Sequence, residues 1–145
     1  MTFGQLTRAM IAAEKPLLDQ HDIQMWDYVV LAGLESGPAP TQLQLAEAVG
    51  RDKTRLIPIL DRLEERGLVH RQPDPADRRN RVVGLTDPGR ALLGSCRQAI
   101  RAMEAKLLDT LEPSERATFL TALERLAEAA VETPPGSGLT VTPHR

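Results

Sequence analysis

The spacing of apolar residues changes from helical to strand-like only once in this sequence, between residues 68 and 85. Leu68–Gln72 and Arg81–Leu85 each have the composition of a short strand, and the eight residues between them are rich in Pro and Asp. These residue types favour turns, so the segment is predicted to be a β-hairpin with its loop over residues 73–80. Elsewhere apolar residues recur every three or four positions, as in amphipathic helices. The predicted fold class is mainly α with one small β-hairpin.

Two short helices are predicted directly before the hairpin, with a tight turn between them. Thr41 and Gln44 have the spacing of a capping box at the start of the first helix, and Gly50 suits its end. Asp52 is a favourable N-cap for the second helix, and Gly67 a favourable C-cap. The residues of the second helix that are predicted to face inward are Leu56, Ile59, Leu60 and Leu63.

Further helices are predicted on both sides of this central motif, over residues 4–20, 24–35, 87–110 and 113–131. Gly37 and Pro38 are expected to close the helix over 24–35, since glycine ends helices and proline prevents their continuation. Two other prolines fall inside helical patterns. A kink or break is therefore expected near residue 15, beside Pro16, and a bend at Pro58. The residues expected to share one face of the helix over 87–110 are Leu92, Cys96, Ala99, Met103 and Leu107.

The outer helices are amphipathic and longer than the central motif needs. A chain of 145 residues has little core with which to cover them all. We therefore expect one domain over residues 1–132 in which the helices over 4–20 and 87–131 form a dimer interface around a central motif at about 24–86. Residues 133–145 lack the apolar content to fold and are expected to be disordered.

The charge of the chain is distributed unevenly. The formal net charge is −2, yet residues 51–81 contain nine Lys or Arg and six Asp or Glu, a local balance of +3 that leaves −5 for the rest. A basic segment in an otherwise acidic protein can direct one surface toward a polyanion. An arginine-rich helix is more often only a solvated face, so this asymmetry alone does not establish a nucleic-acid-binding surface.

Helix, tight turn, helix and basic hairpin together are typical of a winged helix-turn-helix that binds double-stranded DNA, with the hairpin as the wing. The second helix places its first residues at base edges in the major groove, and the start of the preceding helix meets a phosphate. Thr41, Gln42 and Lys53 are therefore expected to contact phosphates. Thr54 and Arg55 have side chains that can reach bases. The wing residues expected to enter a minor groove are Arg78, Arg79 and Arg81.

Several segments resemble the MarR family of winged-helix transcription regulators, over residues 5–131. They are DPADRRNRVVGLT in the wing, LDRLEERGLV before it, TQLQLAEAVG in the first short helix, and LTDPGRALL and LEPSERATFLTALERLAEA in the last two helices. The resemblance implies a homodimer that binds a pseudo-palindromic operator, and many members are repressors released by small phenolic or lipophilic ligands. It also implies that Asp77 braces the wing arginine. Pro58 departs from the pattern, because many members have a polar or basic DNA-contacting residue there.

Other candidate sites are weaker. Cys96 could be a redox switch, but no Lys or His stands where it would lower the thiol pKa, so a buried structural cysteine is preferred. His21 and Trp26 lie near the position of the family's ligand pocket, although such residues more often serve only in packing. Asp61 and Arg62 are expected to form local charge pairs on their helix. The three histidines do not cluster with acids at metal-ligand spacing, so neither a metal nor a cofactor is expected.

The sequence also argues against other classes of protein. We find no glycine-rich phosphate loop, nucleophile elbow or His–acid cluster, so an enzyme is not expected. A winged helix that binds another protein remains the alternative. No run of about 18 apolar residues and no signal peptide is present, and the single cysteine excludes an intrachain disulfide. We therefore expect a cytoplasmic protein that does not enter a membrane.

Overall fold

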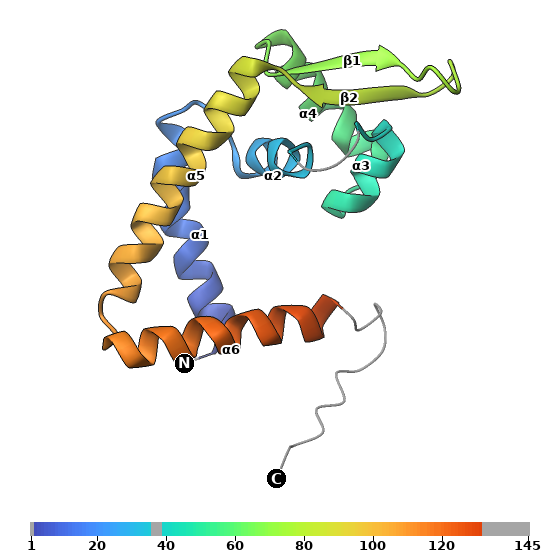
Figure 1. Ribbon diagram of the computed structural model, residues 1–145. Coiled ribbons are helices and arrows are strands. Elements are labelled where there is room, and N and C mark those ends of the chain that lie inside the picture. Colours follow the sequence, from blue (N-terminus) through green and yellow to red (C-terminus); the bar gives the residue numbers. More distant parts are fainter. Residues whose placement is uncertain (1, 36–38, 132–145) are drawn as a thin grey trace. The chain divides into compact units, whose positions relative to one another are not determined.

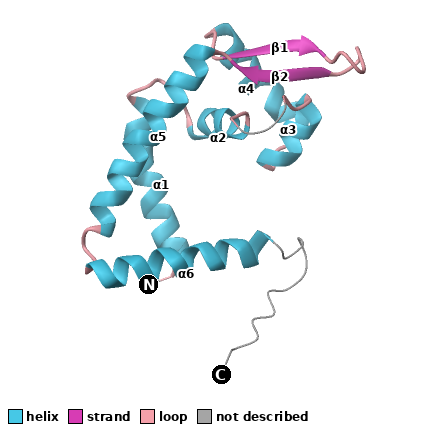
Figure 2. Cartoon of the chain, viewed as in Figure 1, coloured by secondary structure: helices cyan, strands magenta, loops and turns pink. Residues whose placement is uncertain are grey.

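The computed structural model describes residues 2–35 and 39–131, and the chain divides into two compact units, residues 1–103 and 104–145. Figure 1 labels the elements along the chain and Figure 2 separates helices from the single hairpin. Their order confirms the predicted fold class. The elements are α1 (Phe3–Asp19), α2 (Met25–Gly33), α3 (Gln42–Val49), α4 (Lys53–Glu65), β1 (Val69–Pro73), β2 (Arg81–Leu85), α5 (Asp87–Leu108) and α6 (Pro113–Val131).

The predicted caps of α3 and α4 are confirmed. The Gln44 N–H donates to Thr41 Oγ1 over 3.2 Å and the Thr41 N–H donates to Gln44 Oε1 over 2.9 Å, which completes the capping box. Gly50 ends α3 at φ 72°, in the left-handed region that glycine adopts without steric cost. Asp52 caps α4 by accepting the Arg55 N–H over 2.9 Å. These local bonds set where each of the two helices begins.

The hairpin pairs antiparallel, with a register that runs from Val69 opposite Leu85 to Pro73 opposite Arg81. β1 therefore begins and ends one residue later than predicted. A further backbone pairing was not anticipated: Thr41 bridges Val82, and the Val83 N–H donates to the Pro40 carbonyl over 2.9 Å. The residues at the start of α3 are thus hydrogen-bonded to β2, which pairs with β1 along its other edge.

One apolar core holds α2, α3, α4 and the base of the hairpin together. All four residues predicted to face inward on α4 are buried in it. Each fully buried Leu or Val side chain contributes about 1.5–3 kcal/mol of transfer free energy. The buried core residues are Val30, Leu31, Leu34, Leu45, Ala46, Leu56, Ile59, Leu60, Leu63, Leu68, Val69, Val83 and Leu93.

A second, smaller cluster joins the end of α1 to α5. It consists of Leu18, Ile23, Cys96 and Ile100. Cys96 is fully buried, as expected for a structural cysteine, and burial raises the pKa of its thiol. The predicted face of α5 was partly wrong. The buried residues of α5 are Gly89, Leu93, Cys96 and Ile100. Leu92 and Met103 are only partly buried, because the apolar arc of α5 is wide enough to contain two adjacent stripes.

Several other expectations differ from the structure or lie outside it. α1 continues through Pro16 as one helix, so the predicted break near residue 15 is wrong. α4 also continues through Pro58, which is exposed, and the bend expected there stays a prediction. α2 ends at Gly33, two residues earlier than predicted. Gly37 and Pro38, and the tail over 133–145, lie outside the described residues.

The described part of the second unit consists of the end of α5 and α6. No residue of α6 is buried, although the helix carries a row of apolar side chains. The exposed large apolar residues of α6 are Phe119, Leu120, Leu123, Leu126 and Val131. Among the described residues, no helix is both long and apolar enough to cross a bilayer.

Candidate nucleic-acid interface

The first turn of α4 presents Lys53, Thr54 and Arg55 to solvent, while Leu56 and Leu60 on the opposite side are fully buried. The buried side fixes the helix, so the orientation of the exposed turn is set by the core. Arg55 Nε lies 3.6 Å from Asp52 Oδ2, and both side chains are largely exposed. Exposed ion pairs contribute little free energy. Arg55 can therefore leave Asp52 for another acceptor at small cost.

The hairpin loop is shaped by two aspartates that bond to nearby backbone. Asp74 Oδ1 accepts the Ala76 N–H over 2.9 Å, and Asp77 Oδ1 accepts the Arg79 N–H over 3.1 Å. The Asp74 N–H donates to the Asn80 carbonyl over 2.9 Å and closes the loop. Such side-chain-to-backbone bonds define turns without a packed core. Asp77 thus contacts the backbone of Arg79, rather than its guanidinium.

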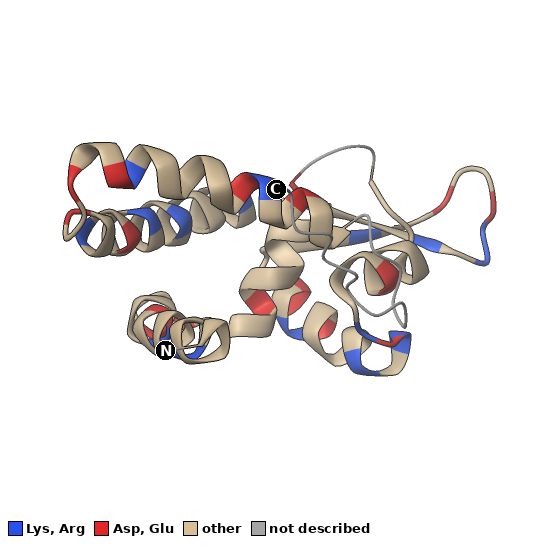
Figure 3. Cartoon of the chain, turned by 90° about the horizontal axis from the view of Figure 1, so that it is seen from below, with Lys and Arg blue, Asp and Glu red and all other residues tan. Residues whose placement is uncertain are grey.

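The predicted wing cations are exposed at this loop. Arg78, Arg79 and Arg81 are all exposed, and Figure 3 shows basic positions on both the strands and the loop. Among the described residues, no ion pair occupies Arg78 or Arg79. Arg81 lies near enough to Glu64 to help lower the pKa of that carboxyl. The hairpin therefore carries positive charge that is available to a polyanion.

Arg71 joins the hairpin to α3 and α4 and was not singled out by the sequence. Its side chain is only 10% exposed, and its Nη2 lies 2.6 Å from Asp61 Oδ1 and 3.1 Å from Glu64 Oε1. Its hydrogen bond lowers the pKa of Glu64, against the opposing effect of burial, and the same bond raises the pKa of Arg71. Gln42 Oε1 also accepts from Arg71, over 3.4 Å. Gln42, predicted to contact phosphate, is 9% exposed and its side-chain oxygen faces this arginine.

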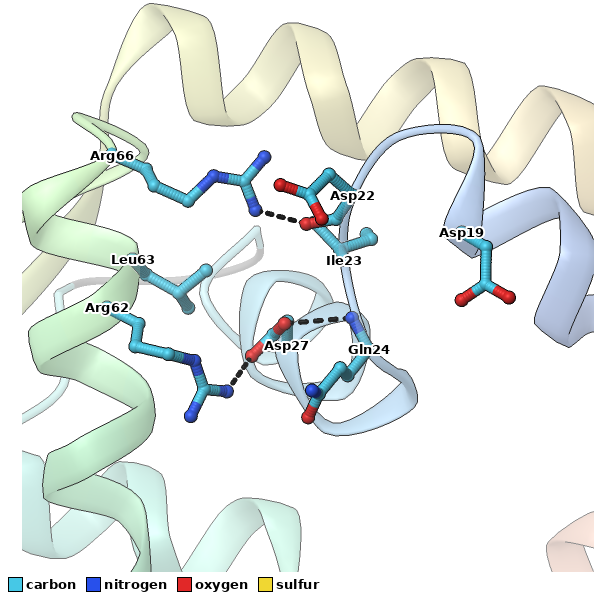
Figure 4. Close-up of a pocket in the computed structure, with 8 residues that line it drawn as sticks. All are labelled: Asp19, Asp22, Ile23, Gln24, Asp27, Arg62, Leu63 and Arg66. Carbon is cyan, nitrogen blue, oxygen red and sulfur yellow. Dashed lines mark hydrogen bonds and ion pairs between the residues drawn. The ribbon is translucent and has the colours of Figure 1, made fainter.

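The other end of α4 is tied to α2 and to the turn before it. Asp27 is 4% exposed, accepts Arg62 Nη2 over 2.6 Å, and also accepts the Gln24 N–H over 2.8 Å. Arg66 donates to the carbonyl of Asp22 over 2.5 Å (Figure 4). The expectation that Asp61 and Arg62 pair locally was wrong, because each pairs with another element. Asp27 could have been noticed as an acid within the apolar stripe of α2, where burial demands a partner.

Two pockets lie beside α2, and neither is lined by His21 or Trp26. One, of about 490 Å³, is the charged pocket of Figure 4, lined by residues that include Asp27, Arg62 and Arg66. The other, of about 440 Å³, is mainly apolar. Its lining residues are Arg8, Ile11, Ala12, Lys15, Leu18, Asp19, Ile23, Gln24 and Met25. Trp26 instead lies under the guanidinium of Arg51, which is 3.8 Å from the centre of its ring.

The described residues contain no set of three or more His, Cys, Asp or Glu that could hold a metal ion. What the first unit does present is an anchored helix with an exposed polar first turn, beside a hairpin that carries exposed arginines. This is the arrangement with which winged helices bind double-stranded DNA.

Two known proteins with similar sequences are named as regulators of transcription. The family model described as "MarR family" matches residues 23–80. The transcriptional regulator HosA of Escherichia coli O111:H- is 32% identical over 108 residues, which cover 74% of this chain and 80% of that protein. A putative transcriptional regulatory protein for the hcr operon of Thauera aromatica is 32% identical over 107 residues. That match covers 74% of this chain and 64% of the Thauera protein.

Solved structures agree with this grouping. A mutant form of MarR from E. coli superposes with a TM-score of 0.79 at 26% identity, covering 88% of this chain and 97% of that chain. The transcriptional repressor CouR, bound to a 23-mer DNA duplex, superposes with a TM-score of 0.71 at 29% identity, covering 87% and 92%. Fold, exposed basic surface and sequence matches therefore agree, and the chain belongs to the MarR family of transcriptional regulators.

Proposed function

We propose that this regulator is a homodimeric repressor that binds a pseudo-palindromic operator through the first turn of α4 and the wing. The observation that carries the proposal is the exposure of Lys53, Thr54 and Arg55 on a helix whose other face is fixed in the core. Thr54 and Arg55 contact bases, and Lys53 contacts a phosphate. CouR, a repressor bound to DNA, supports the same role for this chain.

Thr41 and the wing extend this interface on either side of α4. Thr41 Oγ1 accepts a backbone N–H within its capping box, so its hydroxyl proton is left to donate to a phosphate. Arg78, Arg79 and Arg81 reach the neighbouring minor groove, where a narrow A·T tract concentrates negative potential. Asp77 braces the wing by fixing the backbone at Arg79. Gln42 has its side-chain oxygen on Arg71, so we assign it to positioning the wing rather than to phosphate.

Dimerisation is proposed through α1, α5 and α6 of a single domain over residues 1–132. α6 leaves a row of apolar side chains in water, and Phe3, Leu6 and Ile11 of α1 are also exposed. Exposed apolar rows on a helix are typical of interaction sites. Sedimentation should give a mass twice the 15.9 kDa of the chain. A particle of one chain mass at micromolar concentration would contradict this part of the proposal.

Release from DNA is proposed to follow binding of a small phenolic or lipophilic molecule to the apolar pocket. Its volume of about 440 Å³ lies within the range of small-molecule sites. Ala12→Trp would fill the pocket from α1. We expect this variant to keep operator binding and lose the response to ligands that release the unmodified protein. A variant that responds unchanged would exclude this pocket as the site.

The test of DNA recognition is a gel-shift titration on the DNA that flanks the regulator's own gene, in excess nonspecific competitor. A saturable shift whose footprint shows half-sites about one helical turn apart supports the proposal. Arg55→Ala should lower the preference for operator over competitor by about 1–3 kcal/mol. A loss that is equal on all sequences would make Arg55 a phosphate contact. Arg79→Ala should weaken operator binding without unfolding the protein, and unchanged affinity would contradict the role of the wing.

A further inference from the structure

Arg51 lies in the turn between α3 and α4 and stacks on an aromatic ring. Its guanidinium carbon is 3.8 Å from the centre of the Trp26 ring, and its backbone N–H donates to the Ala46 carbonyl over 3.0 Å. A cation over an indole face gains about 0.5–1 kcal/mol at exposed sites and more where water is excluded. Stacking uses only the face of the guanidinium. The five N–H donors lie in its plane and remain able to bond at the edge.

Arg51 differs in its hydrogen-bonding partners from the other arginines between residues 51 and 71. The other arginines between residues 51 and 71 each bond to an acidic side chain or to backbone carbonyls; they are Arg55, Arg62, Arg66 and Arg71. Among the described residues no carboxylate pairs with Arg51. Its positive charge is therefore oriented by a ring without being neutralised by an acid.

The position of Arg51 in the chain places its backbone beside the first turn of α4, which is proposed above to enter the major groove. Arg51 is two residues before Lys53, so their Cα atoms are at most about 7 Å apart. Each DNA strand carries one phosphate per about 3.4 Å of helix axis. When the first turn of α4 enters the major groove, a side chain of arginine length at residue 51 is within reach of the backbone that borders the groove.

We propose that Arg51 is a further DNA-phosphate contact, held in a binding-ready orientation by its stack on Trp26. The proposal rests on the DNA-binding function proposed above. Trp26, considered from the sequence as a ligand-pocket residue, is then a positioning residue of the DNA interface. A purely structural role, in which Arg51 only shields the indole from water, is the outcome against which the proposal is tested.

The experiment compares the salt dependence of operator binding for the unmodified protein, Arg51→Met and Arg51→Lys. Methionine still covers the indole but has no charge. Each lost phosphate contact reduces the magnitude of the slope of log K against log salt concentration by about 0.9. A dimer loses two such contacts, so its slope should fall in magnitude by about 1.8. Between 200 mM and 50 mM salt, the affinity ratio of unmodified protein to Arg51→Met should then rise about twelvefold. Arg51→Lys keeps the charge but not the planar stack. Its affinity should therefore be lower than that of the unmodified protein by a factor that does not change with salt concentration.

Arg101→Met is the matched control, because it removes one exposed basic charge from α5, outside the DNA-binding lobe. Its salt slope should equal that of the unmodified protein. An Arg51→Met slope that is also unchanged, or an Arg51→Lys slope that falls as far as that of Arg51→Met, would refute the phosphate contact. If the unmodified protein itself does not bind DNA specifically, the proposed function fails and this inference with it.

Discussion

Gly89, in the first turn of α5, is the residue whose substitution the structure constrains most closely. A Cβ built on Gly89 would overlap the carbonyl oxygen of Leu68 and lie 2.9 Å from its carbonyl carbon. Both atoms belong to the backbone, so no side-chain rotation can relieve the clash. The same junction holds two further bonds: the Thr86 N–H donates to the Leu68 carbonyl over 3.2 Å, and Thr86 Oγ1 donates to the Gly67 carbonyl over 2.6 Å. Gly89→Ala must therefore move α5 away from the base of the hairpin.

Three contributions determine how much Gly89→Ala changes the free energy of unfolding. Overpacking a tight site costs about 1–3 kcal/mol. Weakening the two Thr86 bonds adds about 1 kcal/mol for each. Alanine regains at most about 1 kcal/mol over glycine in helix propensity. We expect Gly89→Ala to lower the free energy of unfolding by about 2–4 kcal/mol.

Urea denaturation followed by circular dichroism measures this change. Gly94→Ala is the matched control, because Gly94 is exposed on the same helix and a Cβ there meets nothing within 4 Å. It should raise the free energy of unfolding by about 0.5–1 kcal/mol, since alanine is the better helix former. If Gly89→Ala proved as stable as Gly94→Ala, the close approach of α5 to Leu68 would be refuted.

Two further predictions concern ionisable groups. The hydrogen bond from Arg71 lowers the pKa of Glu64 below its ordinary value of 4.5. The unfolded chain therefore binds the proton more readily than the folded protein, and ionised Glu64 stabilises the fold at pH values above 4.5. This stabilisation is lost as the pH falls through the lowered pKa of Glu64. The difference in unfolding free energy between the unmodified protein and Glu64→Gln should therefore shrink from pH 6 to pH 3. A difference that stays constant over this range would contradict the Arg71–Glu64 interaction. Cys96 is fully buried with a raised thiol pKa, so iodoacetamide should modify it far more slowly in the native protein than in urea. Equal rates would show that α5 does not bury the thiol.

Local signals in the sequence were sufficient to predict the elements of the central motif. The capping box of Thr41, the N-cap Asp52 and the turn residues of the hairpin act through neighbours three or four residues away, so spacing alone reveals them. The inward face of α4 could be predicted for the same reason, because its apolar residues form one narrow stripe.

Contacts between distant residues could not be predicted in this way. α5 has apolar residues over a wide arc, and only the position of α1 decides that Ile100, rather than Ala99, is buried. The pairing of Arg62 with Asp27 joins residues 35 apart in the sequence. Arg71 finds acids on α4 and an amide on α3 only because the hairpin folds back over both helices. The spacing of residues along the sequence contains no information on such partners.

The exposed first turn of α4 and the end that anchors the helix are separate parts with different functions. Its later residues hold the helix to α2 through Arg62 and to the α1–α2 turn through Arg66, while Asp61 and Glu64 receive Arg71 from the hairpin. None of these anchoring side chains belongs to the exposed first turn. Substitutions at Lys53, Thr54 or Arg55 can therefore accumulate during evolution without loss of the fold. With the DNA contacts proposed above, duplicated copies of such a gene could acquire new operators one residue at a time, each intermediate remaining a folded protein.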